Sequence, residues 1–144
     1  MDWKKEAEEK LRRYSAMRQA SENIPGEIKL LQADCVALRS PTNSLRVKSS
    51  GFGREDALIN NIVKRQELAW KLKLVRQWLA HTDRGLLALT PEERLVLQRF
   101  YLSPDRKSVD TLCAELGVEQ STVYRKRDKA LYHFTAALYG IPEM

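Results

Sequence analysis

Residues 108–131 read SVDTLCAELGVEQSTVYRKRDKAL, and this stretch decides which fold the chain can adopt. Ser108 is suited to cap a short helix. The apolar residues that follow it have helical spacing, at Val109, Leu112, Cys113 and Leu116. Gly117 suits a left-handed exit from this helix, and Val118 can fill the turn. A longer helix is then predicted from about Gln120 towards Tyr139.

A short helix, a turn of about three residues that contains glycine, and a longer helix have the spacing of a helix-turn-helix motif. The second helix of such a motif lies in the major groove of DNA, because a helix fits the width of that groove. A helical hairpin that does not bind DNA is the alternative interpretation. The stretch therefore predicts a DNA-binding module.

The residues just upstream predict the first helix of the same module. The segment TPEERLVLQRFY begins at Thr90, which can cap a helix together with Glu93, and Pro91 suits the first helical position. Its apolar face is wide and comprises Leu95, Leu97, Phe100, Tyr101 and Leu102. We therefore expect three helices between residues 90 and 139.

The longer helix contains four basic residues within five positions, and they do not share one face. At about 100° per residue, Val123, Ala130 and Phe134 fall together and predict the core side. Three polar residues fall on the opposite side, namely Ser121, Arg125 and Lys129. Arg127 falls on the core side, where we expect it to pair with an acid of a neighbouring helix, either Glu93 or Glu115.

These positions predict different roles in binding DNA. Arg125 is the best candidate for a base contact, because its guanidinium can bind guanine with two hydrogen bonds. The expected phosphate contacts are Ser108, Thr122, Tyr124 and Lys129. Lys126 lies at the edge of the polar face. The pattern fits a solvated side chain and a phosphate contact equally well there.

The segments LTPEERLVLQRFY and SVDTLCAELGVEQSTVYRKRDKAL resemble region 4 of bacterial sigma-70-type factors. The layout of the whole chain resembles phage regulators of the ArpU/RinA group, which activate late genes. The resemblance implies a sigma-region-4-like fold, promoter DNA as target and RNA polymerase as a partner. It also implies base contacts by Gln120, Ser121 and Arg125.

One residue departs from the pattern of these modules. Glu119 occupies a position where Ser or Thr usually caps the recognition helix, and Glu is a poor cap. Ser121 could cap the helix instead, which would move the first reading residues forward.

Upstream of the module, residues 3–20 predict a helix with one apolar stripe, formed by Trp3, Ala7, Leu11 and Tyr14. The sequence SENIPG predicts a break, after which Pro25 suits the first turn of a second helix. That helix has a short heptad pattern of a coiled coil, at Ile24, Ile28, Leu31, Cys35 and Leu38.

Residues 39–54 predict a basic loop rich in Ser and Gly. It is either a linker or a second DNA contact, the latter formed by Arg46, Lys48 and Arg54. A long helix follows from Glu55 to about Ala80, and Gly85 is expected to act as a hinge after it.

The long helix has two apolar sides. The first comprises Leu58, Ile62, Ala69, Leu72, Val75 and Leu79, and the second comprises Ile59, Val63, Trp70, Leu74 and Trp78. A helix that is apolar on more than half its circumference is expected to pack against neighbours on two sides. We expect it to pack between the two N-terminal helices, or against them and a second copy of the chain as a homodimer.

The net charge of +6 does not come from the module. Residues 83–144 hold nine basic and nine acidic residues, whereas residues 1–82 hold sixteen and ten. Residues 39–76 alone hold nine basic and three acidic residues. A nucleic-acid partner is therefore also expected to touch the middle of the chain.

The sequence thus predicts an all-α protein with a helical hairpin or coiled-coil region at 1–82 and a helix-turn-helix domain at 83–144. The expected function is a sequence-specific transcription regulator, with a sigma-like factor or a DNA-packaging protein as alternatives. No catalytic constellation, metal site or cofactor is expected, and Cys35 and Cys113 are expected to pack in the core. No apolar run approaches the roughly 18 residues of a membrane span, and no signal peptide is seen, so a cytoplasmic location is expected.

Overall fold

The computed structural model describes residues 2–39, 51–103 and 108–140, except for the side chains of 51 and 52. The described residues are almost all helical, joined by short turns, and they include no strand, which confirms the all-α prediction. Its elements, in chain order, are α1 (Trp3–Arg39), α2 (Gly51–Leu87), α3 (Pro91–Leu97), η2 (Gln98–Leu102), α4 (Ser108–Leu116) and α5 (Gln120–Tyr139).

The chain divides into two compact units. We call Arg18–Arg76 the hairpin unit, and Met1–Met17 together with Gln77–Met144 the terminal unit. Each of the two long helices contributes residues to both units. The first seventeen residues thus belong to the same unit as α3, α4 and α5.

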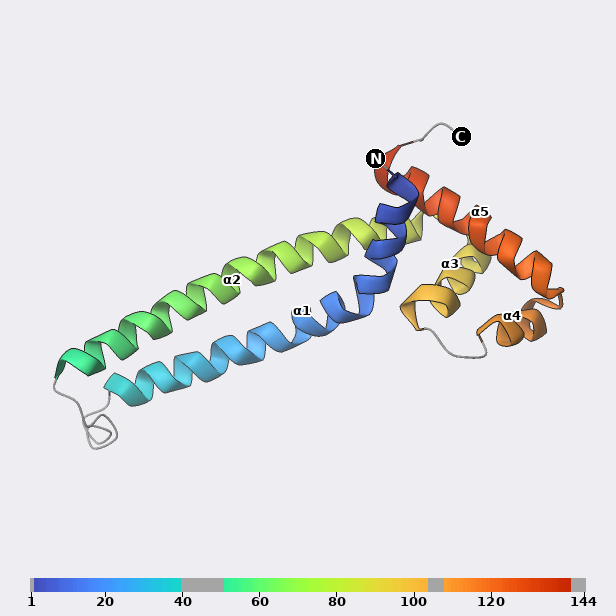
Figure 1. The fold of residues 1–144 in the computed structure, drawn as a ribbon. Helices are drawn as coiled ribbons and strands as arrows, with labels where there is room; N and C mark the ends of the chain where they lie inside the picture. The colour runs from blue at the N-terminus through green and yellow to red at the C-terminus, as the bar shows by residue number, and fades with distance from the viewer. Residues whose placement is uncertain (1, 40–50, 104–107, 141–144) are drawn as a thin grey trace. The chain divides into compact units, whose positions relative to one another are not determined.

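In the hairpin unit, α1 and α2 lie side by side (Figure 1). The predicted heptad residues of α1 form its inward side, because Ile24 and Cys35 are buried. Polar groups of α2 bond to the same side of α1. The Asn61 amide donates to the Leu31 carbonyl over 2.7 Å, and Arg54 Nε donates to the Leu38 carbonyl over 2.6 Å. These bonds provide hydrogen-bond partners for polar side chains at the contact between the two helices.

The prediction of two N-terminal helices separated at SENIPG was wrong. Residues 3–39 form one continuous helix, with Pro25 in its interior. Proline lacks an N–H, so the carbonyl of Ser21 loses its usual partner four residues on, and such a proline costs about 3 kcal/mol. Ile24, directly before Pro25, is buried. Burial of Ile24 and of the other apolar residues on this side of α1 offsets the free energy that the proline costs the helix.

The long helix was also predicted too short. It runs from Gly51 to Leu87 and not from Glu55 to Ala80. Its first predicted side includes the buried residues Leu72 and Val75, whereas four members of the second side are exposed. The helix therefore does not pack between two N-terminal helices. The fifth member of the second side, Trp78, is partly buried, and the Lys10 ammonium of α1 lies 5.3 Å from its ring centroid.

The predicted loop at 39–54 falls mostly outside the described residues. Arg46 and Lys48 are among the residues that are not described, and 51–54 belong to the first turn of α2. Arg54 is half-buried and bonds to the backbone of α1. A second DNA contact at these three residues stays a prediction.

Among the described residues, buried apolar side chains of the terminal unit form a larger and a smaller cluster. The larger joins Ala7 and Leu11 of α1 to the end of α2, to Leu97 and to Phe134 of α5. The smaller joins Val96, Leu112 and Val123, one from each of α3, α4 and α5. Because α5 contributes to both clusters, its orientation about its own axis is fixed over most of its length.

Two tyrosines attach α1 to the rest of this unit. Tyr101 donates its hydroxyl hydrogen to Glu8 over 2.8 Å, and Tyr14 donates to Asp83 over 2.5 Å. Burial, followed by the nearby Glu8 carboxylate, raises the pKa of Tyr101 far above its ordinary value, so its hydroxyl stays a donor. The η2 segment, a π-helical turn that continues α3, carries Tyr101.

Gly85 lies inside α2 and is not a hinge after it. It is buried, and a Cβ atom added there would lie 2.7 Å from Leu138 Cδ2 and 2.9 Å from Phe134 Cε1. The absence of a side chain lets α2 approach α5 closely.

We predict that Gly85→Leu lowers the free energy of unfolding by about 1–3 kcal/mol, because the new side chain overlaps a packed core. The matched control is Gly26→Leu, since Gly26 lies in α1 with nothing within 4 Å of an added Cβ. That control should be neutral or stabilising, because Leu favours a helix over Gly. Urea unfolding measures both, and equal effects of the two substitutions would contradict the close-packing role of Gly85.

Candidate nucleic-acid interface

Helix α5 begins after a short turn whose residues behave as the sequence predicted. Gly117 has a φ of +66°, and its N–H and that of Val118 both bond to the Cys113 carbonyl at the end of α4. Val118 is partly buried against the smaller apolar cluster. This turn fixes where α5 starts relative to α4.

The N-terminus of α5 lacks a side-chain cap. Glu119 is the N-cap residue, in extended conformation, and its side chain makes no capping hydrogen bond. The helix already includes Gln120, and the Glu119 carbonyl accepts a bond from Val123 N. The alternative in which Ser121 caps a later start was therefore wrong. Gln120 and Ser121 lie in the first turn and are exposed.

The two faces of α5 agree with the helical-wheel prediction. Val123, Ala130 and Phe134 are completely buried. Ser121, Arg125 and Lys129 are exposed. The structure thus brings these three predicted contact residues to one solvent-facing surface, which we call the reading face.

Two of the four clustered cations are engaged within the unit. Lys126 Nζ bonds to Glu92 of α3 over 2.5 Å. Arg127 bonds to the adjacent Asp128 over 3.0 Å. Its guanidinium also lies over the rings of Phe100 and Tyr124, at 5.2 and 5.1 Å from their centroids. Arg127 is held towards the fold as predicted, but its acidic partner is neither Glu93 nor Glu115.

The other two cations are not engaged in this way. Among the residues that the structure describes, neither Arg125 nor Lys129 forms an ion pair. A solvated guanidinium and a solvated ammonium on one face remain available to an anionic partner. Of the further predicted contacts, Tyr124 is exposed, Thr122 is half-buried and Ser108 is buried at the start of α4.

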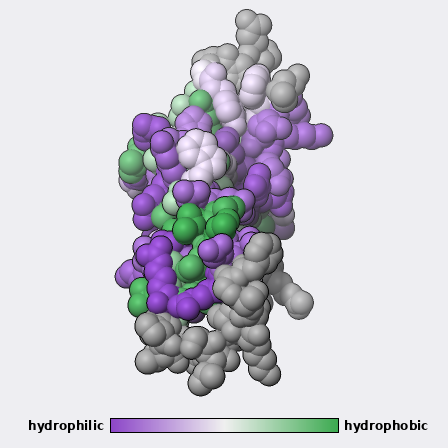
Figure 2. Space-filling view, turned by 90° about the vertical axis from the view of Figure 1, so that its left-hand side faces the viewer, coloured by the Kyte–Doolittle hydropathy of each residue, from purple (hydrophilic) through white to green (hydrophobic). Residues whose placement is uncertain are grey.

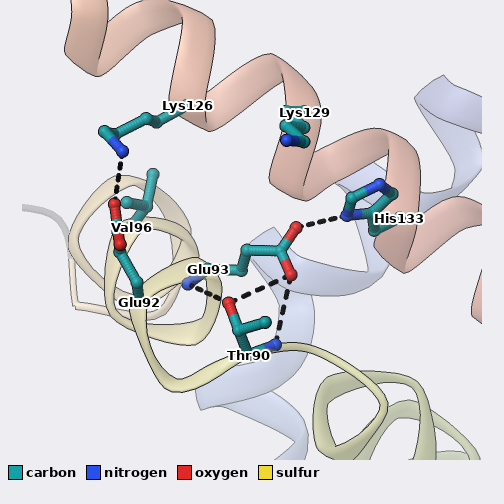
Figure 3. A pocket seen from close by; sticks show the side chains of 7 residues that line it. All are labelled: Thr90, Glu92, Glu93, Val96, Lys126, Lys129 and His133. Atoms are coloured by element: carbon teal, nitrogen blue, oxygen red, sulfur yellow. Dashed lines mark hydrogen bonds and ion pairs between the residues drawn. The ribbon is translucent and has the colours of Figure 1, made fainter.

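A hollow of about 220 Å³ lies beside the reading face, between α3 and α5 (Figure 3). Its lining residues are Thr90, Glu92, Glu93, Val96, Lys126, Lys129 and His133. At its floor the predicted capping box is present: Thr90 Oγ1 accepts from Glu93 N over 3.2 Å, and Thr90 N donates to Glu93 Oε1 over 3.1 Å.

Glu93 has a further partner for which the sequence holds no local signal. Its second carboxylate oxygen bonds to His133 Nδ1 of α5, so one side chain both caps α3 and contacts α5 (Figure 3). The i to i+3 spacing shows the capping box, but the pair with His133 joins positions 40 residues apart and leaves no local pattern. Burial alone would raise the pKa of the Glu93 carboxyl. Bonds from Thr90 and His133 outweigh it and hold the pKa below its ordinary value.

No family model, curated protein or solved structure matches this chain. None of the helices in the described ranges is both long and apolar enough to cross a membrane. The features of α5 are therefore the basis for inferring function.

We predict that acidification weakens the wild-type fold partly through Glu93. Because its folded pKa is lowered, this contribution to stability is present above the unfolded pKa and is lost as the pH falls through the folded value. In Glu93→Gln the amide oxygen can still accept from Thr90, but it does not titrate. The loss of unfolding free energy between pH 7 and pH 3, measured by urea unfolding, should be smaller in this variant.

The matched control is Glu9→Gln. Glu9 is exposed and forms no ion pair with the described residues, so this variant should keep the wild-type pH dependence. If the free energy of unfolding of Glu93→Gln falls with pH as steeply as that of wild type, the Glu93 carboxylate does not stabilise the fold.

We also predict that Glu119→Ser raises the free energy of unfolding by about 1 kcal/mol, because a Ser hydroxyl can accept from the uncapped N–H groups of α5. Glu119→Ala removes the same charge without adding a cap and should bring no such gain. Thermal unfolding of the two variants measures the difference. A gain shared by both would assign the effect to charge and not to capping.

Proposed function

We propose that the protein is a sequence-specific DNA-binding regulator of transcription that binds duplex DNA through the reading face of α5. The observation that carries the proposal is the division of the cations on this helix. Lys126 and Arg127 bond within the unit, whereas Arg125 and Lys129 point to solvent beside Ser121. A helix with this face at its N-terminal half has the side chains that a major-groove reader needs.

The roles of the individual residues follow from their chemistry. Arg125 donates two parallel hydrogen bonds to guanine, and Gln120 and Ser121 contact neighbouring base edges. Lys129 lies one turn further along the same face and contacts phosphate, together with Tyr124 and Thr122. The α4 helix, which precedes the turn, supports α5 through the contact of Leu112 with Val123. Ser108, at the start of α4, is the remaining proposed contact to the DNA phosphates.

The resemblance of residues 90–131 to sigma region 4 supports promoter DNA as the target and RNA polymerase as a protein partner. The layout of the whole chain supports a role as activator of phage late genes. The described module contains no excess of positive charge, so its binding depends on specific contacts more than on non-specific attraction.

We predict that Arg125→Ala abolishes the preference for one or two base pairs, at a cost of about 1–3 kcal/mol for the preferred sequence. The measurement is selection of bound duplexes from a random DNA pool, followed by affinity determination for the enriched sequence. Wild type should enrich a defined sequence, and the variant should bind the preferred and scrambled duplexes with nearly equal affinity.

Lys126→Ala is the matched control, because it removes one positive charge from the adjacent position, where Glu92 already engages the side chain. It should keep the selected sequence. If Arg125→Ala selects the same sequence with wild-type discrimination, the assignment of the reading face is wrong. If wild type enriches no sequence at all, the proposed function is wrong.

A further inference from the structure

The hairpin unit carries large apolar side chains that the described residues leave largely exposed. On α2, Ile59, Val63, Trp70 and Leu74 are 57%, 44%, 60% and 47% exposed. The spacing of these four residues places them on one stripe of the helix, at about 100° per residue. The α1-facing residues Asn61, Leu72 and Val75 lie on roughly the opposite side. We call the four exposed residues the outer stripe.

An exposed stripe of this kind needs an explanation, because soluble proteins rarely leave contiguous large apolar side chains in water. Figure 2 shows hydrophobic side chains exposed among hydrophilic ones on one face of the molecule. Tryptophan is also among the residues that contribute most to protein interfaces. The Lys73 ammonium lies 5.5 Å from the Trp70 ring centroid but leaves the ring mostly exposed.

We propose that the outer stripe is the interface between two copies of this chain, paired antiparallel along α2. The spacing of its members is the first reason. The steps between Ile59, Val63, Trp70 and Leu74 are four, seven and four residues, so they read the same in both directions. A two-fold axis between Gln66 and Glu67 therefore sets Ile59 against Leu74 of the other copy, and Val63 against Trp70, at both ends simultaneously.

The sizes of the paired residues fit this arrangement. The bulky Trp70 ring faces the small Val63 of the other copy, and Ile59 and Leu74 have similar volumes. Large and small side chains that alternate across an interface interdigitate without voids. Beside the axis, Gln66 and Glu67 are exposed, and the Gln66 amide of each copy can donate a hydrogen bond to the Glu67 carboxylate of the other.

Charge along the stripe is the second reason. Its N-terminal end is flanked by the exposed acids Glu55 and Asp56, and its C-terminal end by the exposed bases Lys71 and Lys73. Antiparallel pairing places the acidic end of each stripe near the basic end of the other, whereas parallel pairing brings ends of like charge together. Complementary charges of this kind set the orientation of paired helices.

The proposal does not rest on the DNA-binding function, since the outer stripe lies wholly in the hairpin unit and the reading face in the terminal unit. A dimer would carry two reading faces in one particle.

The test is sedimentation equilibrium of the full chain over a range of concentrations. Wild type should dimerise, and Trp70→Ser should raise the dissociation constant by about tenfold or more. Val36→Ser is the matched control, because Val36 is 70% exposed on α1 and outside the stripe. It should leave the dissociation constant unchanged. Circular dichroism verifies that both variants stay helical, as expected for substitutions of exposed residues.

Charge reversal tests the orientation. Glu55→Lys with Asp56→Lys should weaken the dimer, and addition of Lys71→Glu and Lys73→Glu should restore it. A parallel dimer would not be restored in this way. A wild-type chain that stays monomeric at the highest concentration, or a Trp70→Ser variant that dimerises as well as wild type, would overturn the proposal.

Discussion

Burial of one side of α5 is the constraint on which the rest of the terminal unit depends. Val123 packs with α3 and α4 in the smaller apolar cluster, while Ala130, Leu131 and Phe134 pack with α1, α2 and α3 in the larger. A helix held in two cores cannot rotate about its axis, because rotation would expose both sets of side chains. The direction of Arg125 and Lys129 towards solvent is therefore a consequence of apolar packing on the opposite side.

Electrostatic contacts around α5 then separate the cations that act within the fold from those that remain available. Lys126 forms an ion pair with Glu92. Arg127 forms an ion pair with Asp128 and lies over the rings of Phe100 and Tyr124. Both ion pairs are partly exposed, so each contributes little to stability, and their main effect is to set side-chain direction. The proposed DNA contacts use the cations that these pairs leave in solvent.

Local signals predicted local structure well. The capping box at Thr90 and Glu93, the left-handed Gly117 and the buried side of α5 are all present, because each depends on residues within a few positions of one another. Pro25 and Gly85 were misinterpreted for the opposite reason. Both are usual helix breakers, and only packing between distant segments shows why the helix continues through them. The bond between Glu93 and His133 also joins distant segments, so no local pattern predicts it. The assignment of base contacts remains a prediction from position and chemistry.

The central claim is that duplex DNA binds the N-terminal half of α5. Amide chemical shifts of the labelled chain, followed during titration with a short duplex selected from a random pool, test this claim residue by residue. The account predicts shift changes concentrated at Gln120, Ser121, Arg125 and Lys129, with little change at the outer stripe of α2. Shift changes confined to the hairpin unit, or none at saturating DNA, would contradict it.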